Sequence, residues 1–453
     1  MIMTKPERQT WTNRLTYVLT VAGATVGFGA TWRFPYLVGE NGGGAYVLLF
    51  CVAMILIGIP MILVENVIGR RLHVNSIDAF NTKNRSISKY WKIIGYMGLL
   101  GAFGIMAYYM VLGGWVINYI ISLISGSLDI SSVITKEQAK QFYDTSIAGS
   151  PLQIILYTFI FVFINYIILI KGIIAGIERA VKYLMPLLFL FLIGMVIRNI
   201  TLPGAMEGII YYLKPDFSKI TPHLFIMVLG QVFFALSLGF GVLITLSSYL
   251  SKTENLVQTA IITGFTNTVI AVLAGFMIFP SLFSFGIEPN AGPTLVFQSL
   301  PIVFSHLWAG RFFAVIFFGL LLIAALTTSI TIYEVIITAL QEKLKFRRSK
   351  AIIVTLGGIF LLGNIPSILG DNSLKDITFF GKSIFDTFDY VSGNILFLLT
   401  ALGCAIFVGF VLKEEAKQEL SSTPNSLFST IWFNYVKFVV PLIILVIFIS
   451  NLI

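Results

Sequence analysis

Cysteine and histidine are scarce in this chain, with two and three residues respectively among 453. Cys51 and Cys404 each lie inside a long apolar run, so no disulfide is expected and both are interpreted as buried thiols. His73, His223 and His306 lack the spacing of metal ligands, and no phosphate-binding loop or nucleophile elbow occurs. These absences give no support to an enzymatic function.

Charge is also sparse, because Asp, Glu, Lys and Arg make up 11% of the chain, whereas a soluble protein carries about 25%. Apolar residues instead make up 57%, gathered in runs of the roughly 20 residues that a helix needs to cross a bilayer. The whole chain, 1–453, is therefore predicted to form a single all-α polytopic membrane domain. Eleven transmembrane helices are expected, at 13–37, 45–69, 93–124, 151–170, 176–198, 222–250, 257–285, 308–340, 350–370, 384–412 and 428–451.

Basic residues give the chain a net charge of +9, but their distribution does not indicate nucleic-acid binding. Twenty of them fall in one alternating set of loops, such as those with Arg70 and Arg71, and 8 fall in the other set. The positive-inside rule then places the N-terminus in the cytoplasm, and eleven crossings place the C-terminus outside. We expect a multi-pass protein of the inner (cytoplasmic) membrane, with the lipid bilayer and not nucleic acid as its surroundings.

Two glycine-rich motifs interrupt apolar runs, Gly23–Gly29 and Ala235–Gly241, and their Gly-Phe-Gly core recurs 212 positions apart. Glycine weakens a membrane helix and lets its backbone approach another group closely. Small-residue helix packing is the alternative explanation for one such motif, but a matched pair favours a central binding site.

The spacing of the two motifs also predicts an internal repeat. Helices one to five (13–198) and six to ten (222–412) each open with an interrupted helix. Because five crossings is an odd number, the second block enters the membrane in the opposite direction, which defines a 5+5 inverted repeat. The eleventh helix, 428–451, lies outside the repeat.

Four stretches carry the motifs of a known transporter family. They are Arg14-Leu15 with Gly23–Gly29, Trp32–Tyr36 and Glu40–Ala45; Gly58–Pro60 with Glu65 and Gly69-Arg70; Gln231–Phe234 with Ser237–Gly241; and Leu326–Ile330. In this combination the chain resembles the neurotransmitter:sodium symporters, and among them the bacterial eleven-helix amino acid transporters related to the leucine transporter. The resemblance covers essentially the whole chain.

The resemblance implies a substrate site between the first, third, sixth and eighth helices. Gly27 stands where amine carriers of the family have an aspartate, so we expect a substrate that brings its own carboxylate, such as an amino acid. The backbone at Thr25, Gly27 and Gly29 and the Tyr109 hydroxyl would face that carboxylate. The side-chain pocket would be lined by Ile105, Phe234, Phe240 and Ile332, with Ser237 and Thr328 at its polar edge. This apolar, uncharged lining favours a hydrophobic or aromatic side chain.

Two sodium sites are usual in the family, and the resemblance implies that they differ here. The second site would use carbonyls of Gly23, Val26 and Ala324 with the hydroxyls of Thr327 and Thr328. The first site lacks two side-chain ligands, because Ala30 and Ala235 replace an Asn and a Thr or Ser, which leaves Asn267 as a remnant. Ala235, with Phe50 in place of a tyrosine, also implies independence of chloride. The hypothesis is coupling to a single Na⁺ at the second site.

The family resemblance also implies gates on both sides of the substrate site. Arg33 and Asp389, with Gln231, would close the outer path, because burying either charge alone at membrane depth is costly. On the cytoplasmic side the gate residues would be Arg8, Trp11, Tyr249 and Glu342. Two further carboxyl groups lie inside predicted spans: Glu65 is expected to hold the broken backbone, and Glu334 to line the inner path.

The function that these patterns favour is sodium-coupled import of a neutral hydrophobic or aromatic amino acid by alternating access. A carrier for another small carboxylate-bearing solute and a proton-coupled amino acid transporter stay open as alternatives. A channel is less favoured, because both ends of the path carry predicted closing pairs, and a sensing receptor would need a cytoplasmic signalling domain. Whether the chain forms a homodimer is left open.

Overall fold

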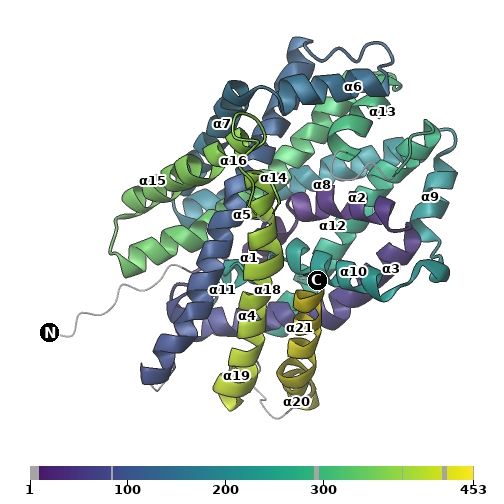
Figure 1. Ribbon diagram of the computed structural model, residues 1–453. Coiled ribbons are helices and arrows are strands. Elements are labelled where there is room, and N and C mark those ends of the chain that lie inside the picture. Colours follow the sequence, from purple (N-terminus) through teal and green to yellow (C-terminus); the bar gives the residue numbers. More distant parts are fainter. Residues whose placement is uncertain (1–9, 83–84, 290–294, 380, 421–425, 452–453) are drawn as a thin grey trace.

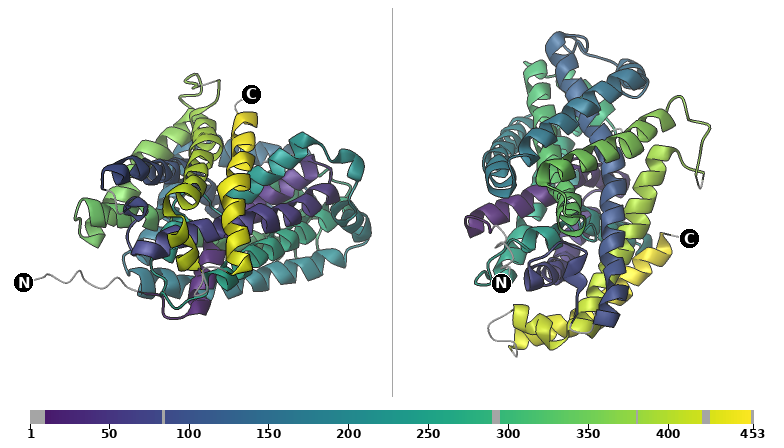
Figure 2. Two further views of the ribbon diagram at one scale, coloured as in Figure 1. Left: turned by 90° about the horizontal axis from the view of Figure 1, so that it is seen from below. Right: turned by 90° about the vertical axis from the view of Figure 1, so that its left-hand side faces the viewer.

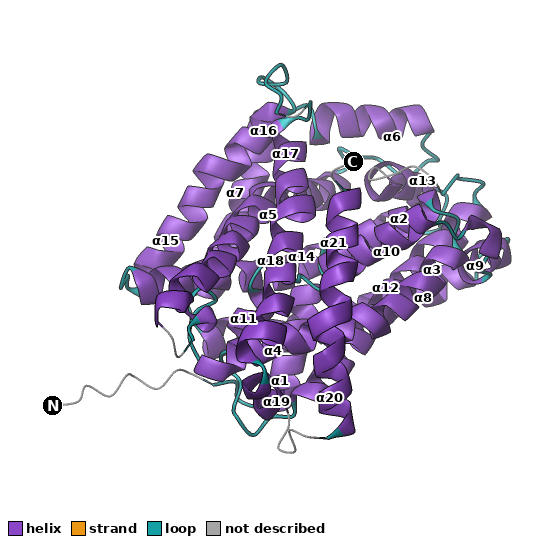
Figure 3. Ribbon diagram, turned by 60° about the horizontal axis from the view of Figure 1, so that its bottom comes forward, coloured by secondary structure: helices purple, strands orange, loops and turns teal. Residues whose placement is uncertain are grey.

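The computed structural model describes residues 10–82, 85–289, 295–379, 381–420 and 426–451, and within these ranges the chain is all-helical. Apart from one isolated bridge between Phe379 and Lys382, the described residues pair no β-strands, as Figure 3 shows by the absence of strand colour. The all-helical fold that the apolar runs predict is therefore confirmed.

Among the described residues, nine helical segments are long and apolar enough to cross a membrane; Figure 1 shows how the helices are arranged. They are α3 (Gly44–Ala53) with η2 (Met54–Gly58) and α4 (Ile59–Leu72); α5 (Arg85–Ser125); α7 (Pro151–Leu169); η5 (Ile173–Glu178) with α8 (Arg179–Ile200); α12 (Leu256–Ser284); α14 (Gly310–Lys343); α15 (Arg348–Ile359) with η9 (Phe360–Asn364) and α16 (Ile365–Gly370); α17 (Ile384–Tyr390) with η10 (Val391–Leu396), α18 (Phe397–Ile406) and η11 (Phe407–Leu412); and α20 (Leu427–Asn434) with η12 (Tyr435–Val439) and α21 (Val440–Ser450).

Two predicted spans are interrupted. Near the N-terminus, α1 (Arg14–Thr25) is followed by η1 (Gly29–Arg33) and α2 (Phe34–Glu40), and the two parts are bent by 52° relative to each other. The predicted span 222–250 consists of two short helices, α10 (Pro222–Ala235) and α11 (Val242–Ser247), on either side of the second glycine motif. If the bent pair near the N-terminus is counted as one span, the described residues contain up to ten helical spans whose length and composition allow them to cross a membrane. The number eleven, the inverted repeat and the orientation stay predictions.

Short helices connect the spans. Those with described bounds are η3 (Asp78–Phe80), α6 (Lys136–Phe142), η4 (Tyr143–Ile147), α9 (Ala205–Leu213), η6 (Phe217–Lys219), η8 (Leu295–Ser299), α13 (Leu300–Ser305) and α19 (Glu414–Leu420). Local capping sets several starts: Thr135 and Gln138 form a reciprocal capping box at the start of α6, and the Thr221 hydroxyl caps α10.

The helices differ in how much of their surface the protein covers. The most apolar windows of α5 and α14 are 89% and 72% buried, whereas those of η5–α8 and of α20–α21 are 28% buried. The first pair therefore forms the core, and the others face outward toward lipid. α14 packs against α5, α8 and α1, and α12 packs against α1 and α4. Figure 2 shows the C-terminal helices, in yellow, on the outside of the helix bundle.

Candidate substrate and ion site

The first helix break opens the backbone beside α5. α1 ends at Thr25, and the N–H of Val26 still donates to the Ala22 carbonyl at 2.9 Å. Two residues further on, the N–H of Phe28 donates to the hydroxyl of Tyr109 at 3.3 Å. The ring of Phe28 also packs against Tyr109, with centroids 4.8 Å apart. A polar backbone end and a tyrosine hydroxyl are thus placed together at the break.

The second break is a left-handed stretch between α10 and α11. Ser237, Gly239 and Gly241 have φ of 51°, 84° and 75°, a region that glycine adopts readily and serine rarely. The carboxylate of Glu65 accepts the Gly239 N–H at 2.7 Å, which confirms the predicted support of the broken backbone. The Ser237 hydroxyl donates to the Ala24 carbonyl at 3.1 Å and so joins the two breaks.

The two glycine motifs serve different purposes despite their shared sequence. Gly27 does not have the positive φ of the second break, but a methyl group there would collide with the hydroxyls of Thr328 and Tyr109. At Gly239 a methyl group would collide with the carbonyl of Phe397. Glycine is therefore needed at 27 for a close approach, and at 239 for both the approach and the backbone conformation.

A narrow cavity of about 10 Å³ lies at the first break. Its walls include Thr25, Gly27, Gly29, Ile105, Tyr109, Phe234, Ser237, Thr328 and Ile332, together with Ala24 and Phe28. Nine of the ten predicted substrate residues thus lie around one space. Phe240 is not in its wall, because its ring packs against Phe397 at 5.5 Å. The position of Phe28 inside the Gly-Phe-Gly core was the signal that could have identified it in the sequence.

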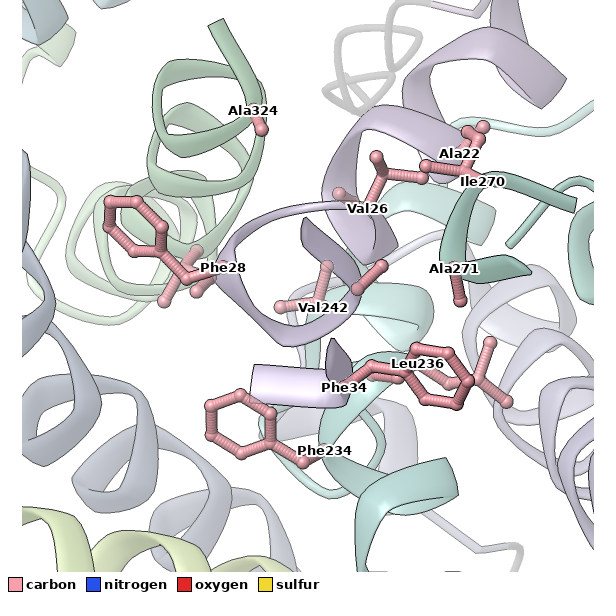
Figure 4. Packing of buried hydrophobic residues seen from close by; sticks show 14 of the residues in the cluster. Ala22, Val26, Phe28, Phe34, Phe234, Leu236, Val242, Ile270, Ala271 and Ala324 are labelled. Carbon is pink, nitrogen blue, oxygen red and sulfur yellow. The ribbon is translucent and has the colours of Figure 1, made fainter. Parts of the chain in front are cut away.

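The lining of the cavity is uncharged, since no Asp, Glu, Lys or Arg belongs to it. Hydroxyl groups come from Thr25, Tyr109, Ser237 and Thr328, and the remaining side chains are apolar. Figure 4 shows hydrophobic side chains around the break, with Phe28 on one side and Ile270 and Ala271 on the other. The chemistry of this lining suits an apolar side chain, with a polar group oriented at the hydroxyl side.

Oxygen atoms gather on the other side of the first break, where α14 meets α1. The Thr328 hydroxyl donates to the Gly23 carbonyl at 2.9 Å, across the helix interface. The Thr327 hydroxyl lies 3.1 Å from the carbonyls of Ile323 and Ala324 in its own helix. The Cβ of a residue at Gly23 would lie 3.0 Å from Thr327 Cβ, so the two helices are in close contact. Val26 follows directly at the end of α1.

Asn267 lies between the two breaks and is fully buried. Its side-chain nitrogen donates to the carbonyls of Thr25 at 2.9 Å and of Ala235 at 3.2 Å. The neighbouring side chains at Ala30 and Ala235 offer only methyl groups, and the Asn267 oxygen has no hydrogen-bond partner among the described residues. The amide N–H groups therefore tie together one carbonyl from each of the two breaks.

The two charged residues of the predicted outer gate do not form an ion pair. Arg33 stacks its guanidinium on the ring of Phe234 at 4.2 Å, and no ion pair within 4.0 Å joins it to Asp389. The Gln231 amide instead donates to the Gly29 carbonyl at 2.7 Å. The Arg33–Asp389 contact stays a prediction for a state in which the outer path is closed.

At the predicted inner gate, Trp11 makes mainly aromatic and backbone contacts. The Trp11 indole N–H donates to the Leu246 carbonyl at 3.0 Å, and its ring packs edge-on against Tyr249 at 6.0 Å. Glu342 accepts hydrogen bonds from the backbone and side chain of Asn75, both at 2.8 Å. Arg8, the fourth predicted inner gate residue, lies outside the described residues.

A buried ion pair next to this gate was not predicted. The carboxylate of Glu334, fully buried, accepts from both terminal nitrogens of Arg348, at 3.0 and 2.8 Å. Tyr249 adds its hydroxyl at 3.3 Å. Arg348 also donates to the Leu169 carbonyl, so that it joins α15, α14 and the end of α7. The ionisable Glu inside an apolar run was a signal for a partner, but nothing in the sequence named Arg348.

The fold and the site are those of an all-helical, multi-pass membrane protein with a central cavity at an interrupted helix. The chain belongs to the sodium:neurotransmitter symporter family, whose model matches residues 8–149 and 146–453. It is therefore a sodium-dependent transporter and not an enzyme.

Similar proteins agree with this assignment. A protein of Haemophilus influenzae, described as an uncharacterized sodium-dependent transporter, is 82% identical over 456 residues and 100% of both chains. The Bacillus subtilis sodium-dependent transporter YhdH is 37% identical over 443 residues, 97% of each chain. The fold matches the crystal structure of MhsT in complex with L-phenylalanine with a TM-score of 0.89 and 35% identity, over 98% of this chain and 100% of that one.

Proposed function

We propose that the protein is a symporter that imports a neutral hydrophobic or aromatic amino acid together with sodium. The observation that carries this proposal is the uncharged cavity at the first break, with hydroxyls on one side and apolar side chains on the other. The similar structure of MhsT was solved with L-phenylalanine, an amino acid of this class.

The carboxylate of the substrate would lie at the start of η1. A helix N-terminus carries partial positive charge, and the Tyr109 hydroxyl, which accepts the Phe28 N–H, keeps its own proton to donate there. Ile105, Phe234 and Ile332 would enclose the side chain. A methyl group at Gly27 would remove the space between Tyr109 and Thr328, which explains why the smallest residue stands there.

One sodium ion would be transported with each substrate, at the second site. Carbonyl oxygens of Gly23, Val26 and Ala324 with the hydroxyls of Thr327 and Thr328 form a ligand set that suits a hard cation. At the first site, the donors of Asn267 already satisfy the Thr25 and Ala235 carbonyls, which a cation would otherwise bind. The side chains of Ala235 and Phe50 have no group that could bind chloride, so chloride independence is part of the proposal.

Transport would proceed by alternating access. Trp11 and Tyr249 pack together on the inner side, whereas Arg33 and Asp389 are unpaired on the outer side. Closure would bring the outer pair together, and release to the cytoplasm would separate the inner residues. The helix blocks that move would be the two predicted repeats, 13–198 and 222–412, with helix 428–451 outside them.

The same proposal places the protein in the bacterial cytoplasmic membrane with its N-terminus inside and C-terminus outside. A homodimer stays open. The alternatives are a carrier for another small carboxylate-bearing solute and proton coupling, for which the fully buried Glu65 and Glu334 are candidate groups.

Uptake of radiolabelled L-phenylalanine into proteoliposomes, with and without an inward Na⁺ gradient, tests the proposal. Gradient-dependent accumulation that unlabelled neutral amino acids compete away is expected. Accumulation driven equally well by a proton gradient in Na⁺-free buffer would favour the proton-coupled alternative. Sodium-driven uptake of a carboxylate without an amino group, in preference to every amino acid in the panel, would replace the proposed substrate class.

A further inference from the structure

Lys437 places a positive charge inside the most C-terminal apolar span. The span runs from Leu427 to Ser450, with mean hydropathy 2.2, and Lys437 lies ten residues after its start. At 1.5 Å per residue this is about 15 Å along the helix. An ammonium group is costly to insert in such a span, so it is expected to have a partner.

The partner is not a carboxylate of the described chain. Within 4.0 Å of the Lys437 ammonium the described residues offer no Asp or Glu oxygen. Three aromatic rings surround it instead: Phe438 at 4.9 Å, Phe410 at 5.2 Å and Phe433 at 6.0 Å. Ring faces attract a cation but leave its charge in place.

The helix crossing is built around this side chain. A Cβ at Gly409 would lie 2.8 Å from Lys437 Cα and 3.0 Å from its Cβ, so only glycine fits opposite the lysine. Phe410 and Phe438 are 46% and 55% exposed, on the outward face of the helices. The ammonium is not among the buried unpartnered nitrogens, so it reaches the surface between these rings.

The neighbouring Lys417 shows the contrast. It stacks on the same Phe433 ring at 5.0 Å, but its ammonium has Glu414 as a counter-ion at 2.9 Å. Lys437 therefore presents an uncompensated cation on a surface that is otherwise apolar. Gly409, which lies against Lys437, is three residues before Leu412, where its own span ends, so the Lys437 ammonium lies near the level of the lipid headgroups and meets their phosphates.

We propose that the slot formed by Phe410, Phe433, Lys437 and Phe438 binds an anionic phospholipid. The lipid phosphate pairs with the Lys437 ammonium, and an acyl chain lies along the exposed rings of Phe410 and Phe438. The proposal does not depend on the substrate or on the sodium stoichiometry of the transporter.

The test is binding of phosphatidylglycerol to the purified full-length protein in detergent, measured by native mass spectrometry and by the shift in melting temperature, with phosphatidylcholine as the zwitterionic comparison. The expected result is preferential binding of phosphatidylglycerol, weakened about fivefold in Lys437→Gln and restored in Lys437→Arg. Lys437→Met provides a second neutral variant, which keeps the span apolar and so is not expected to unfold.

The matched control is Lys350→Gln, since Lys350 also stacks on an aromatic ring, Phe346 at 4.2 Å, but at another helix. Phosphatidylglycerol affinity should be unchanged in this control. Equal lipid affinity in wild type and in both neutral Lys437 variants would overturn the proposal. Binding of inorganic phosphate that displaces the lipid at equal concentration would also overturn it, because the ligand would then not be a lipid.

Discussion

The hydroxyl of Thr328 donates to the carbonyl of Gly23 at 2.9 Å, across 305 positions of sequence. The same hydroxyl is part of the cavity wall. One side chain therefore belongs both to the oxygen cluster proposed for sodium and to the space proposed for the substrate. An ion that pulls Thr328 toward Gly23 also fixes the wall against which the substrate packs, which gives coupling a direct physical route.

Thr327→Val is expected to weaken sodium binding without altering the substrate cavity, because Thr327 does not line that cavity. Loss of one oxygen ligand should raise the Na⁺ concentration for half-maximal uptake roughly tenfold. Thr400→Val is the matched control, since Thr400 is also buried and bonds back to its own helix, at Leu396. Sodium titration of uptake checks this, and an unchanged half-maximal concentration in Thr327→Val would speak against the second site.

Gly27→Ala is expected to abolish high-affinity substrate binding. The added methyl group meets the hydroxyls of Thr328 and Tyr109, and overpacking of this kind costs about 1–3 kcal/mol, or roughly tenfold or more in affinity. Gly230→Ala is the control, because nothing lies within 4 Å of a methyl group at that position of α10. Substrate-induced thermal stabilisation measures both variants; binding by Gly27→Ala as tight as wild type would contradict the placement of the substrate.

Much of this fold follows from the sequence because a bilayer leaves few choices. Apolar runs of the right length must be helices there, so the predicted span 384–412 matches the observed helical segment residue for residue. The glycines of span 222–250 predict that the span is interrupted, but they do not predict the backbone conformation of the break. Its three left-handed residues, one of them Ser237, depend on contacts with Glu65 and Phe397, which lie far away in the sequence.

The site was less predictable, because it depends on rotamers and on partners. Phe240 and Phe234 have the same chemistry and nearby positions, yet the cavity includes only Phe234, since the ring of Phe240 packs on Phe397. Likewise, the sequence predicts Asn267 as a remnant of the first sodium site, but no pattern in it predicts that the side-chain nitrogen donates a hydrogen bond to the Thr25 carbonyl. Tertiary packing decides both cases.

The Glu334–Arg348 ion pair is expected to behave as a unit. Removing one member leaves the other charge without its partner, and because Arg348 is 22% exposed the loss is expected to be about 2 kcal/mol. Glu334→Gln and Arg348→Gln should each lower the melting temperature, whereas the double variant should recover part of the loss. Strictly additive effects of the two substitutions would show that the pair does not couple.

Asp78, in the connection between α4 and α5, should make the stability of the fold depend on pH in the acidic range. Partial burial opposes its ionisation, but hydrogen bonds from Lys343 and Lys92 outweigh this and lower its pKa from 3.8 to about 2. Because the folded pKa is depressed, the stabilisation is complete above about pH 4 and is lost as the pH falls toward 2. Asp78→Asn should therefore lower the melting temperature at pH 7, with a difference from wild type that shrinks below pH 4. Asp376→Asn, at an exposed loop carboxylate, is the control; a difference independent of pH would contradict the account.

The central claim is that one sodium ion accompanies each substrate, and the sodium:substrate stoichiometry tests it most directly. In proteoliposomes with a fixed Na⁺ gradient, the membrane potential at which net flux of labelled L-phenylalanine vanishes gives the number of ions and charges per substrate. The account predicts one Na⁺ and one net positive charge per molecule. A reversal potential that requires two Na⁺ per substrate would contradict it, because Asn267 would then have given way to a second ion.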